Sequence, residues 1–132
     1  MDLASVKAFA TRYTAAWCSQ DPESVASFFA EDGSLTINAA PPSVGRQAIA
    51  ADARGFMSAF PDLVVRMDSI ESEGSGFVYR WTLTGTNSGP GGTGKHVRIS
   101  GHEEWTMGTD GLISKSLGHY DEAEYARQIQ GR

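Results

Sequence analysis

The hydrophobic periodicity of this chain of 132 residues changes at Pro61, and that change constrains the fold more than any other feature. Before Pro61, apolar residues recur every three or four positions, which is the spacing of a helix that buries one face. From Leu63 onward, apolar and polar residues alternate, as they do along a strand with one buried face. Helices first and strands afterwards predict an α+β fold in which helices cover one face of a sheet.

Periodicity and turn residues place the individual elements on either side of Pro61. Three helices are expected before it, from 6 to about 21, at 23–30 and at 46–59, with one short strand at 34–38. Four strands are expected after it, at 63–71, 76–86, 97–107 and 112–120. Asp121, with Glu124 three residues later, has the spacing of a helix N-cap and begins a short last helix. The predicted architecture is three helices packed on a curved antiparallel sheet around a cone-shaped apolar pocket.

Length and charge limit the organisation and the partners of the chain. Its length fits one domain, residues 1–132. The 16 acidic and 11 basic residues give a net charge of −5, and the bases do not cluster, which argues against nucleic-acid or membrane binding. No apolar run is long enough to cross a membrane, so we expect a cytoplasmic protein. The single cysteine and the spacing of the three histidines give no metal-ligand motif, and we expect neither a metal nor an organic cofactor.

Five short fragments follow one another along the chain: Ala59-Phe60-Pro61-Asp62-Leu63, Gly85-Thr86-Asn87, Thr93-Gly94-Lys95, Asp110-Gly111-Leu112-Ile113 and His119-Tyr120-Asp121. In their order and spacing the chain resembles the SnoaL-like polyketide cyclase family of the nuclear transport factor 2-like superfamily, over essentially its whole length. The resemblance implies the cone-shaped α+β fold. It leaves the activity open, because the superfamily includes cyclases, isomerases, dehydratases, epoxide hydrolases and non-catalytic proteins.

His119 and Asp121 end the last predicted strand and share one of its faces. Ile113 and Leu117 have the same parity, which predicts that this face is the inner one. The resemblance implies an acid–base carboxylate and a neighbouring histidine here, so Asp121 and His119 are the predicted catalytic pair. An apolar pocket disfavours the charge of a carboxylate and makes it a stronger base. The alternative is that Asp121 is only the N-cap of the last helix.

The preceding strand offers a second carboxylate. Glu103 shares its parity with Trp105 and Met107, and these large apolar neighbours predict that Glu103 faces the pocket and contacts the substrate. A bulge near Gly101 would instead turn His102 inward. The alternative for either residue is an exposed position on the sheet.

Further side chains are expected to line the pocket. Asn38, at the end of the first strand, and Tyr13, on the inner face of the first helix, are candidates for hydrogen bonds to a substrate. Their alternatives are capping of a turn and packing in the core. Aromatic side chains are suited either to wall a pocket for a flat hydrophobic or aromatic molecule or to pack as core: Trp17, Phe56, Phe60, Trp81 and Trp105.

Two classes of function follow from these residues and from the resemblance. The first is a cofactor-independent acid–base enzyme, either a polyketide cyclase that performs an intramolecular aldol reaction or an isomerase, with dehydratase and epoxide hydrolase as alternatives. The second is a non-catalytic module that binds a small ligand or another protein. The resemblance also implies a homodimer formed through the open face of the sheet.

Overall fold

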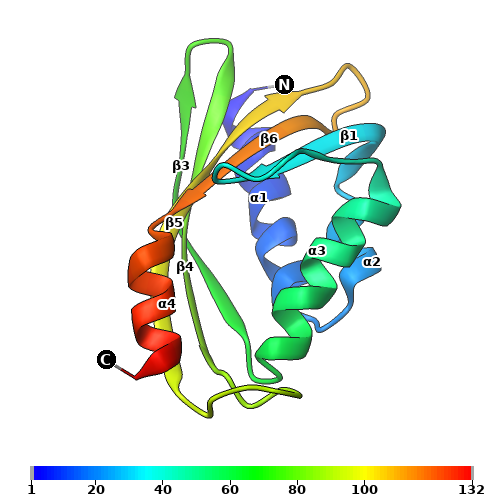
Figure 1. The fold of residues 1–132 in the computed structure, drawn as a ribbon. Helices are drawn as coiled ribbons and strands as arrows, with labels where there is room; N and C mark the ends of the chain where they lie inside the picture. The colour runs from blue at the N-terminus through cyan, green and yellow to red at the C-terminus, as the bar shows by residue number, and fades with distance from the viewer. Residues whose placement is uncertain (1, 132) are drawn as a thin grey trace.

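The computed structural model describes residues 2–131 and has its first three helices on one side of a strongly curved sheet (Figure 1). Six strands form this sheet in the order β2-β1-β6-β5-β4-β3. The α+β class predicted from the periodicity is confirmed. No helix within residues 2–131 is both long enough and apolar enough to cross a membrane.

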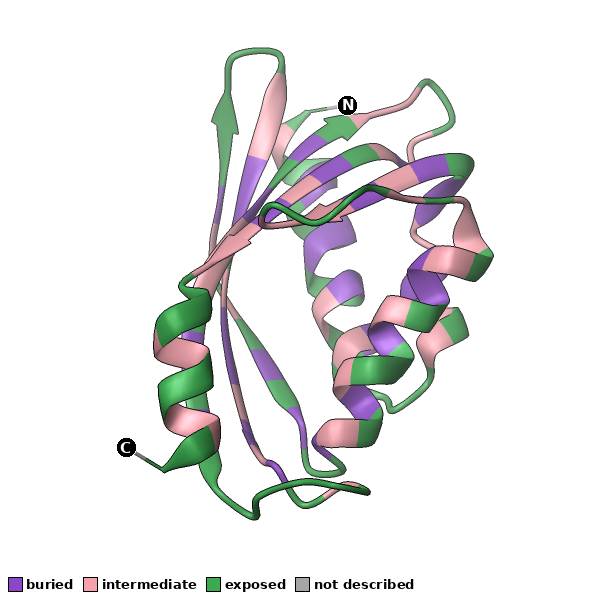
Figure 2. Ribbon diagram, in the orientation of Figure 1, coloured by how far each residue is buried: buried purple, intermediate pink, exposed green. Residues whose placement is uncertain are grey.

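Both long helices form as predicted, one with the predicted bounds and the other displaced by three residues toward the N-terminus at each end. Helix α1 spans Leu3–Cys18, and the Asp2 side chain caps it by accepting a hydrogen bond from the Ser5 backbone N–H. Helix α3 spans Arg46–Ala59 and ends just before Pro61, which cannot continue a helix. Both helices bury one apolar stripe against the sheet, and Figure 2 shows the buried residues on their inner faces. Helical periodicity therefore predicted both elements and the side that each one buries.

The second helix is shorter than predicted, and the strand after it is longer. Helix α2 spans Pro22–Ala26, and β1 spans Phe29–Ile37, so Phe29 and Ala30 belong to the sheet and not to the helix. Phe29 is fully buried and lies opposite Ile113 of β6. Burial against a distant strand outweighs the local helical pattern here. The two-residue strand β2, Ser43–Val44, was not predicted.

The remaining strands lie where alternation predicted them. They are β3 (Val64–Glu73), β4 (Gly76–Thr86), β5 (His96–Met107) and β6 (Ile113–Tyr120), paired antiparallel in sequence order. The expectation of a wholly antiparallel sheet is corrected at one place, because β1 pairs with β6 in parallel. This pairing connects the N-terminal half of the chain to the last strand and helps to close the cone.

The last helix, α4 (Glu122–Gln130), lies beside the end of β5 that extends past β6. Gln128 of α4 bonds both to the backbone N–H and to the carbonyl of Arg98, at 2.7 and 2.9 Å, as a neighbouring strand would. Tyr125 and Ile129 pack on a buried cluster that includes Phe60 and Val97. Helix α4 therefore covers the part of the inner sheet face that α1 and α3 leave open.

Candidate functional site

A cavity whose solvent-accessible volume is about 70 Å³ opens between the inner face of the sheet and helices α1, α3 and α4. Its wall is mostly apolar and aromatic, and every long helix and every strand except β2 contributes to it. The aromatic lining residues are Trp17, Phe56, Tyr79, Trp81, Tyr120 and Tyr125. The apolar and aromatic character of this wall suits a small molecule with apolar rings.

Glu103 is the only carboxylate among the residues that line this cavity. It lies on β5, is 7% exposed, and is held by three side-chain donors from different elements. Its Oε1 accepts hydrogen bonds from Ser116 Oγ at 2.7 Å and from Trp105 Nε1 at 3.0 Å. The Tyr13 hydroxyl lies 3.1 Å from both Oε1 and Oε2. The only donor to Oε2 among the described residues is therefore the Tyr13 hydroxyl, which Oε2 shares with Oε1. Oε2 retains the capacity to accept a proton.

Burial destabilises the charged form of Glu103, and the three hydrogen-bond donors partly stabilise it. Burial raises the pKa of Glu103, and the hydrogen bonds from Trp105, Ser116 and Tyr13 oppose the increase. Burial, followed by the negative charge of Glu103, raises the pKa of Tyr13 well above its usual value. The Tyr13 hydroxyl consequently stays protonated and remains a donor to the carboxylate.

An aromatic shell fixes the position of this carboxylate. Tyr79 stacks on Trp105 with ring centroids 4.9 Å apart, and Tyr13 meets Trp105 edge to face at 5.2 Å. The Tyr79 hydroxyl lies 2.6 Å from Thr14 Oγ1 of α1, which ties the helix to β4. These fully buried rings restrict the side chains that donate to Glu103, so the network is rigid.

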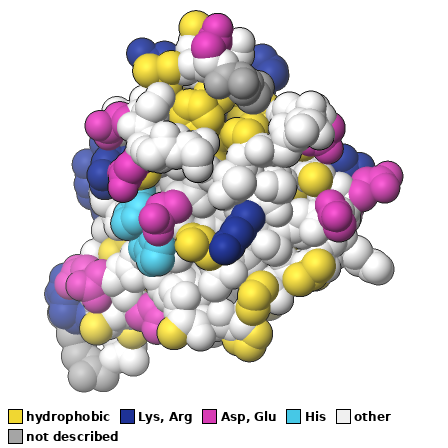
Figure 3. Space-filling model, turned by 90° about the horizontal axis from the view of Figure 1, so that it is seen from above, with side chains coloured by type: hydrophobic (Ala, Val, Ile, Leu, Met, Phe, Trp, Pro, Cys, Tyr) yellow, Lys and Arg dark blue, Asp and Glu magenta, His cyan; other side chains and the backbone are white. Residues whose placement is uncertain are grey.

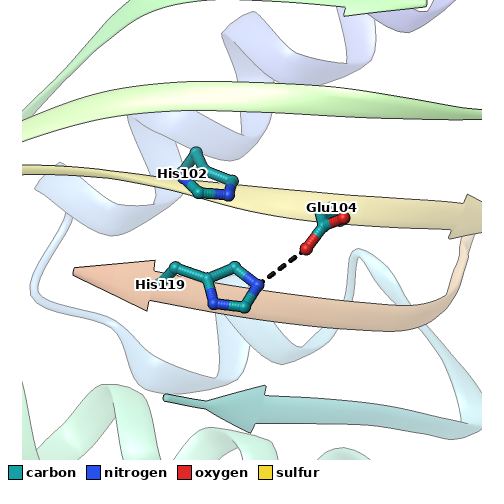
Figure 4. A group of neighbouring side chains, drawn as sticks. All are labelled: His102, Glu104 and His119. Carbon is teal, nitrogen blue, oxygen red and sulfur yellow. Dashed lines mark hydrogen bonds and ion pairs between the residues drawn. The ribbon is translucent and has the colours of Figure 1, made fainter. Parts of the chain in front are cut away.

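The predicted parity of the last strand is wrong beyond Ile113. Thr106 lies opposite Lys115 and Met107 lies opposite Ile113, so Ser114 is an extra residue in β6, a β-bulge. The bulge turns Ser116, Gly118 and Tyr120 to the inner face and puts Leu117 and His119 on the outer face. His119 borders the cavity, but its imidazole points away, and its Nε2 lies 2.7 Å from Oε2 of Glu104 (Figure 4).

Asp121 occupies the N-cap position of α4. Its Oδ1 accepts a hydrogen bond from the Glu124 backbone N–H at 3.0 Å, and the residue is exposed. It is not among the residues that line the cavity. The structural alternative given for Asp121 therefore matches its observed contacts, and its catalytic role stays a prediction.

The predicted orientation of β5 is confirmed, because Glu103 faces inward and His102 faces outward. Contact of Glu103 with a substrate stays a prediction. The register with β4 runs through Gly101 without a bulge. A side chain on Gly101 would meet the His119 carbonyl oxygen and the Trp81 ring, since an added Cβ would lie 2.6 Å from Cζ2 of Trp81 and closer still to that oxygen. Glycine here thus makes room for a cavity-lining indole and does not mark an irregular strand.

The other predicted residues divide between the cavity wall and the core. Trp17, Phe56 and Trp81 line the cavity, whereas Tyr13, Phe60 and Trp105 are buried core residues outside its lining. Asn38 is also outside the lining. It adopts a φ of 52°, accepts a hydrogen bond from the Tyr120 backbone N–H and donates to Glu122. Its contacts are those of a turn residue that holds the start of α4.

Sequence reasoning missed the apolar lining residues Leu35, Ile37, Val65, Leu83 and Ile99. It also missed four residues near Glu103 or at the cavity mouth, namely Ser116, Gly118, Tyr120 and Tyr125. Three of them lie beyond the bulge of β6, so the incorrect parity concealed them. Gly118 lies directly opposite Glu103, where the absence of a side chain leaves space beside the carboxylate. The apolar spacing of Tyr125 and Ile129 on the last helix was the signal that could have identified Tyr125.

One group within residues 2–131 has the side chains to hold a metal ion, and it lies on the outer face of the sheet. The ligand atoms of His102, Glu104 and His119 all lie within 4.8 Å of one another. The cavity itself offers a single carboxylate and no inward-pointing histidine among its lining residues. Its arrangement suits proton transfer in an apolar environment.

A family model described as SnoaL-like polyketide cyclase matches residues 7–129. TsrD from Streptomyces laurentii is similar in structure, with a TM-score of 0.83, 22% identity and coverage of 100% of this chain and 99% of that one. A protein with a ketosteroid isomerase-like fold from Catenulispora acidiphila has a TM-score of 0.80, 16% identity and 92% coverage of both chains. A phenazine biosynthesis-related protein from Pseudomonas aeruginosa has a TM-score of 0.75 and 15% identity, and the match covers 98% of this chain and 86% of that one. No curated protein matches the chain by sequence.

Proposed function

Because the chain belongs to the SnoaL-like polyketide cyclase family, we propose that it is a cofactor-independent acid–base enzyme acting on an apolar carbonyl compound. The substrate would be a ring-containing ketone held in the aromatic cavity. The observation that carries this proposal is Glu103, the one carboxylate in the cavity wall, fixed by three donors and partly free at Oε2.

In the proposed reaction, Oε2 of Glu103 takes a proton from the carbon next to the substrate carbonyl. The electrons of the broken C–H bond pass into an enolate, and Glu103 becomes a neutral acid. The enolate carbon then attacks a second carbonyl of the same molecule, as in an aldol cyclisation, or is reprotonated at another carbon, as in an isomerisation. Glu103 returns its proton in the last step, so the reaction is balanced without a co-reactant.

Two tyrosines at the cavity wall are suitable donors to the enolate oxygen. Burial raises the pKa of Tyr120 and of Tyr125, so both hydroxyls keep their protons at neutral pH. Donors that are fixed before the reaction stabilise the charge that develops on the oxygen.

The test is hydrogen–deuterium exchange at the acidic carbon of 2-tetralone, an apolar bicyclic ketone, followed by NMR in D₂O. We expect the protein to accelerate the exchange and Glu103→Gln to reduce the acceleration about 100-fold or more, since the amide cannot take the proton. Asp121→Asn should stay within about twofold of the unmodified protein. This comparison also tests Asp121 as the predicted catalytic base.

Ser116→Ala serves as a packing control, because it disturbs the same network but keeps the carboxylate. It should retain exchange within about tenfold of the unmodified protein and give an unchanged near-UV circular dichroism spectrum. Full exchange activity in Glu103→Gln, or its loss in Asp121→Asn alone, would refute the assignment of Glu103 as the base.

A second candidate function is a non-catalytic module that binds a small apolar molecule. It is favoured by the three hydrogen bonds to Glu103, which also suit a purely structural link between α1, β5 and β6. Under this candidate, 2-tetralone binds but its protons exchange no faster than in buffer. A dehydratase or epoxide hydrolase would use the same carboxylate on another substrate. The homodimer and the cytoplasmic location stay predictions.

A further inference from the structure

The outer face of the sheet carries a group of three polar side chains behind the cavity. His102 of β5 lies directly opposite His119 of β6, and the two rings stack with centroids 4.7 Å apart. Glu104 follows His102 by two residues on the same face, and its Oε2 lies 2.7 Å from His119 Nε2. Figure 4 shows the three side chains projecting from two adjacent strands toward a common point. We call this set the outer-face triad.

The spacing of the outer-face triad suits a transition-metal ion. Its ligand atoms lie within 4.8 Å of one another. An ion bound at about 2.1 Å from each ligand holds those atoms roughly 3.4 to 4.2 Å apart. His119 Nε2 and Glu104 Oε2, now 2.7 Å apart, would move apart, and the more distant ligand atoms would approach by at most roughly 1.4 Å. Rotations of the side chains of His119 and Glu104, which are 44% and 47% exposed, allow such movements. The backbones already have the required register, because the strands are paired on both sides of the group.

Ligand chemistry selects the class of ion. Two imidazole nitrogens and one carboxylate oxygen suit Zn²⁺, Co²⁺, Ni²⁺ or Cu²⁺, whereas Mg²⁺ and Ca²⁺ prefer sites made of oxygen alone. Histidine side chains gather on the surface next to an acidic group (Figure 3), so solvent can reach the site and fill the remaining coordination positions. The net charge of −5 also favours the approach of a cation.

One cation lies close to the triad. Arg80 of β4 is directly opposite His102, on the far side from His119. Its Nε is 3.3 Å from Oε1 of Glu71, so an acidic neighbour offsets part of its charge. The positive charge of Arg80 should weaken metal binding without preventing it. Replacing Arg80 by a neutral residue should therefore increase the affinity for the metal ion.

We propose that His102, Glu104 and His119 form a binding site for a divalent transition-metal ion, with Zn²⁺ as its representative. His119 borders the cavity, but its imidazole points away from it, and Glu103, between two of the ligands, points to the other side of the sheet. The three ligand groups therefore lie on the sheet face away from the cavity. Binding joins β5 to β6 directly behind the proposed base. It therefore stabilises the strand pair that carries both Glu103 and Ser116, one of its donors.

The test is calorimetric titration of the full chain, first stripped with a chelator, with ZnCl₂. We expect one Zn²⁺ per chain and a higher melting temperature in its presence. His102→Ala, His119→Ala and Glu104→Gln should each weaken binding at least tenfold. Arg80→Gln should strengthen it. With Co²⁺ as the probe, visible absorption bands typical of nitrogen and oxygen ligands should appear and be lost in the same three variants.

His96→Ala is the matched control, because His96 lies on the same strand but outside the triad. It should leave the affinity for Zn²⁺ unchanged. Equal affinity in His119→Ala and in the unmodified protein would overturn the proposal, and so would an equal loss in His96→Ala. Both readouts are independent of exchange activity, so failure of this site and failure of Glu103 as a base can be told apart.

Discussion

At the scale of single residues, two carboxylates on the sheet show how surroundings set a pKa in opposite directions. Burial dominates at Glu103 and raises its pKa, because its three donors offset only part of the lost hydration. At Asp68, the extra residue of a bulge in β3, a hydrogen bond from Thr82 Oγ1 at 2.6 Å dominates and lowers the pKa. The same functional group is thereby suited to accept a proton in one place and to stay charged in the other.

The lowered pKa of Asp68 predicts a pH-dependent contribution to stability. Because the folded-state pKa lies below the usual 3.8, the contribution is present above pH 3.8 and is lost as the pH falls through the folded-state value. Thr82→Val removes the bond. The unmodified protein should therefore exceed the Thr82→Val variant in unfolding free energy by more at pH 7 than at pH 3. Urea denaturation at the two pH values measures this difference.

Thr82 also contacts Ser100 Oγ, and loss of that contact shifts stability equally at all pH values. Asp68→Asn separates the two effects, since an amide does not titrate there. In the Asp68→Asn background, Thr82→Val should produce a difference that does not change with pH. A pH-dependent difference in that background would contradict the assignment to Asp68.

At the scale of elements, α4 completes a strand edge that would otherwise be unpaired. Strand β5 continues beyond the end of its pairing with β6, and Gln128 satisfies both backbone groups of Arg98 there. An unpaired edge invites association with other chains. The helix thus covers the edge of the sheet and contributes Tyr125 to the cavity wall.

Gln128→Ala should loosen α4 from β5. We expect faster hydrogen–deuterium exchange of the Arg98 amide, measured by NMR, because that N–H loses its acceptor. Gln128→Glu keeps an acceptor for this N–H but loses the donor to the Arg98 carbonyl, and its exchange rate should lie between the other two. Unchanged exchange in Gln128→Ala would show that Tyr125 and Ile129 alone hold the helix.

At the scale of the whole molecule, the parallel pairing of β1 with β6 and the cover provided by α4 turn a meander into a cone. The resulting cavity has an apolar wall with one acidic group, although the chain as a whole carries a net charge of −5. The net negative charge of the chain therefore does not make the cavity wall polar. Affinity for a neutral ligand should depend on the volume and the apolar area of the cavity, and little on salt.

Leu83→Phe should reduce the affinity for 2-tetralone about tenfold, because the larger ring occupies space in the cavity wall. Val64→Phe is the matched control. It introduces the same ring on a residue that is 52% exposed outside the cavity, and it should leave the affinity unchanged. The measurement is calorimetric titration at low and at high salt, and a strong salt dependence would argue against an apolar binding site.

The sequence by itself determined the order of the helices and of every strand except β2, the bounds of α3, the inward parity of Glu103 and the N-cap spacing at Asp121. Each of these depends on periodicity or spacing within one element, which local residues encode. Only the tertiary structure decided the place of Phe29 in a strand, the parity of β6 after Ser114 and the meeting of His102 with His119. Bulges and strand registers depend on partners far away in the chain, so no local pattern records them.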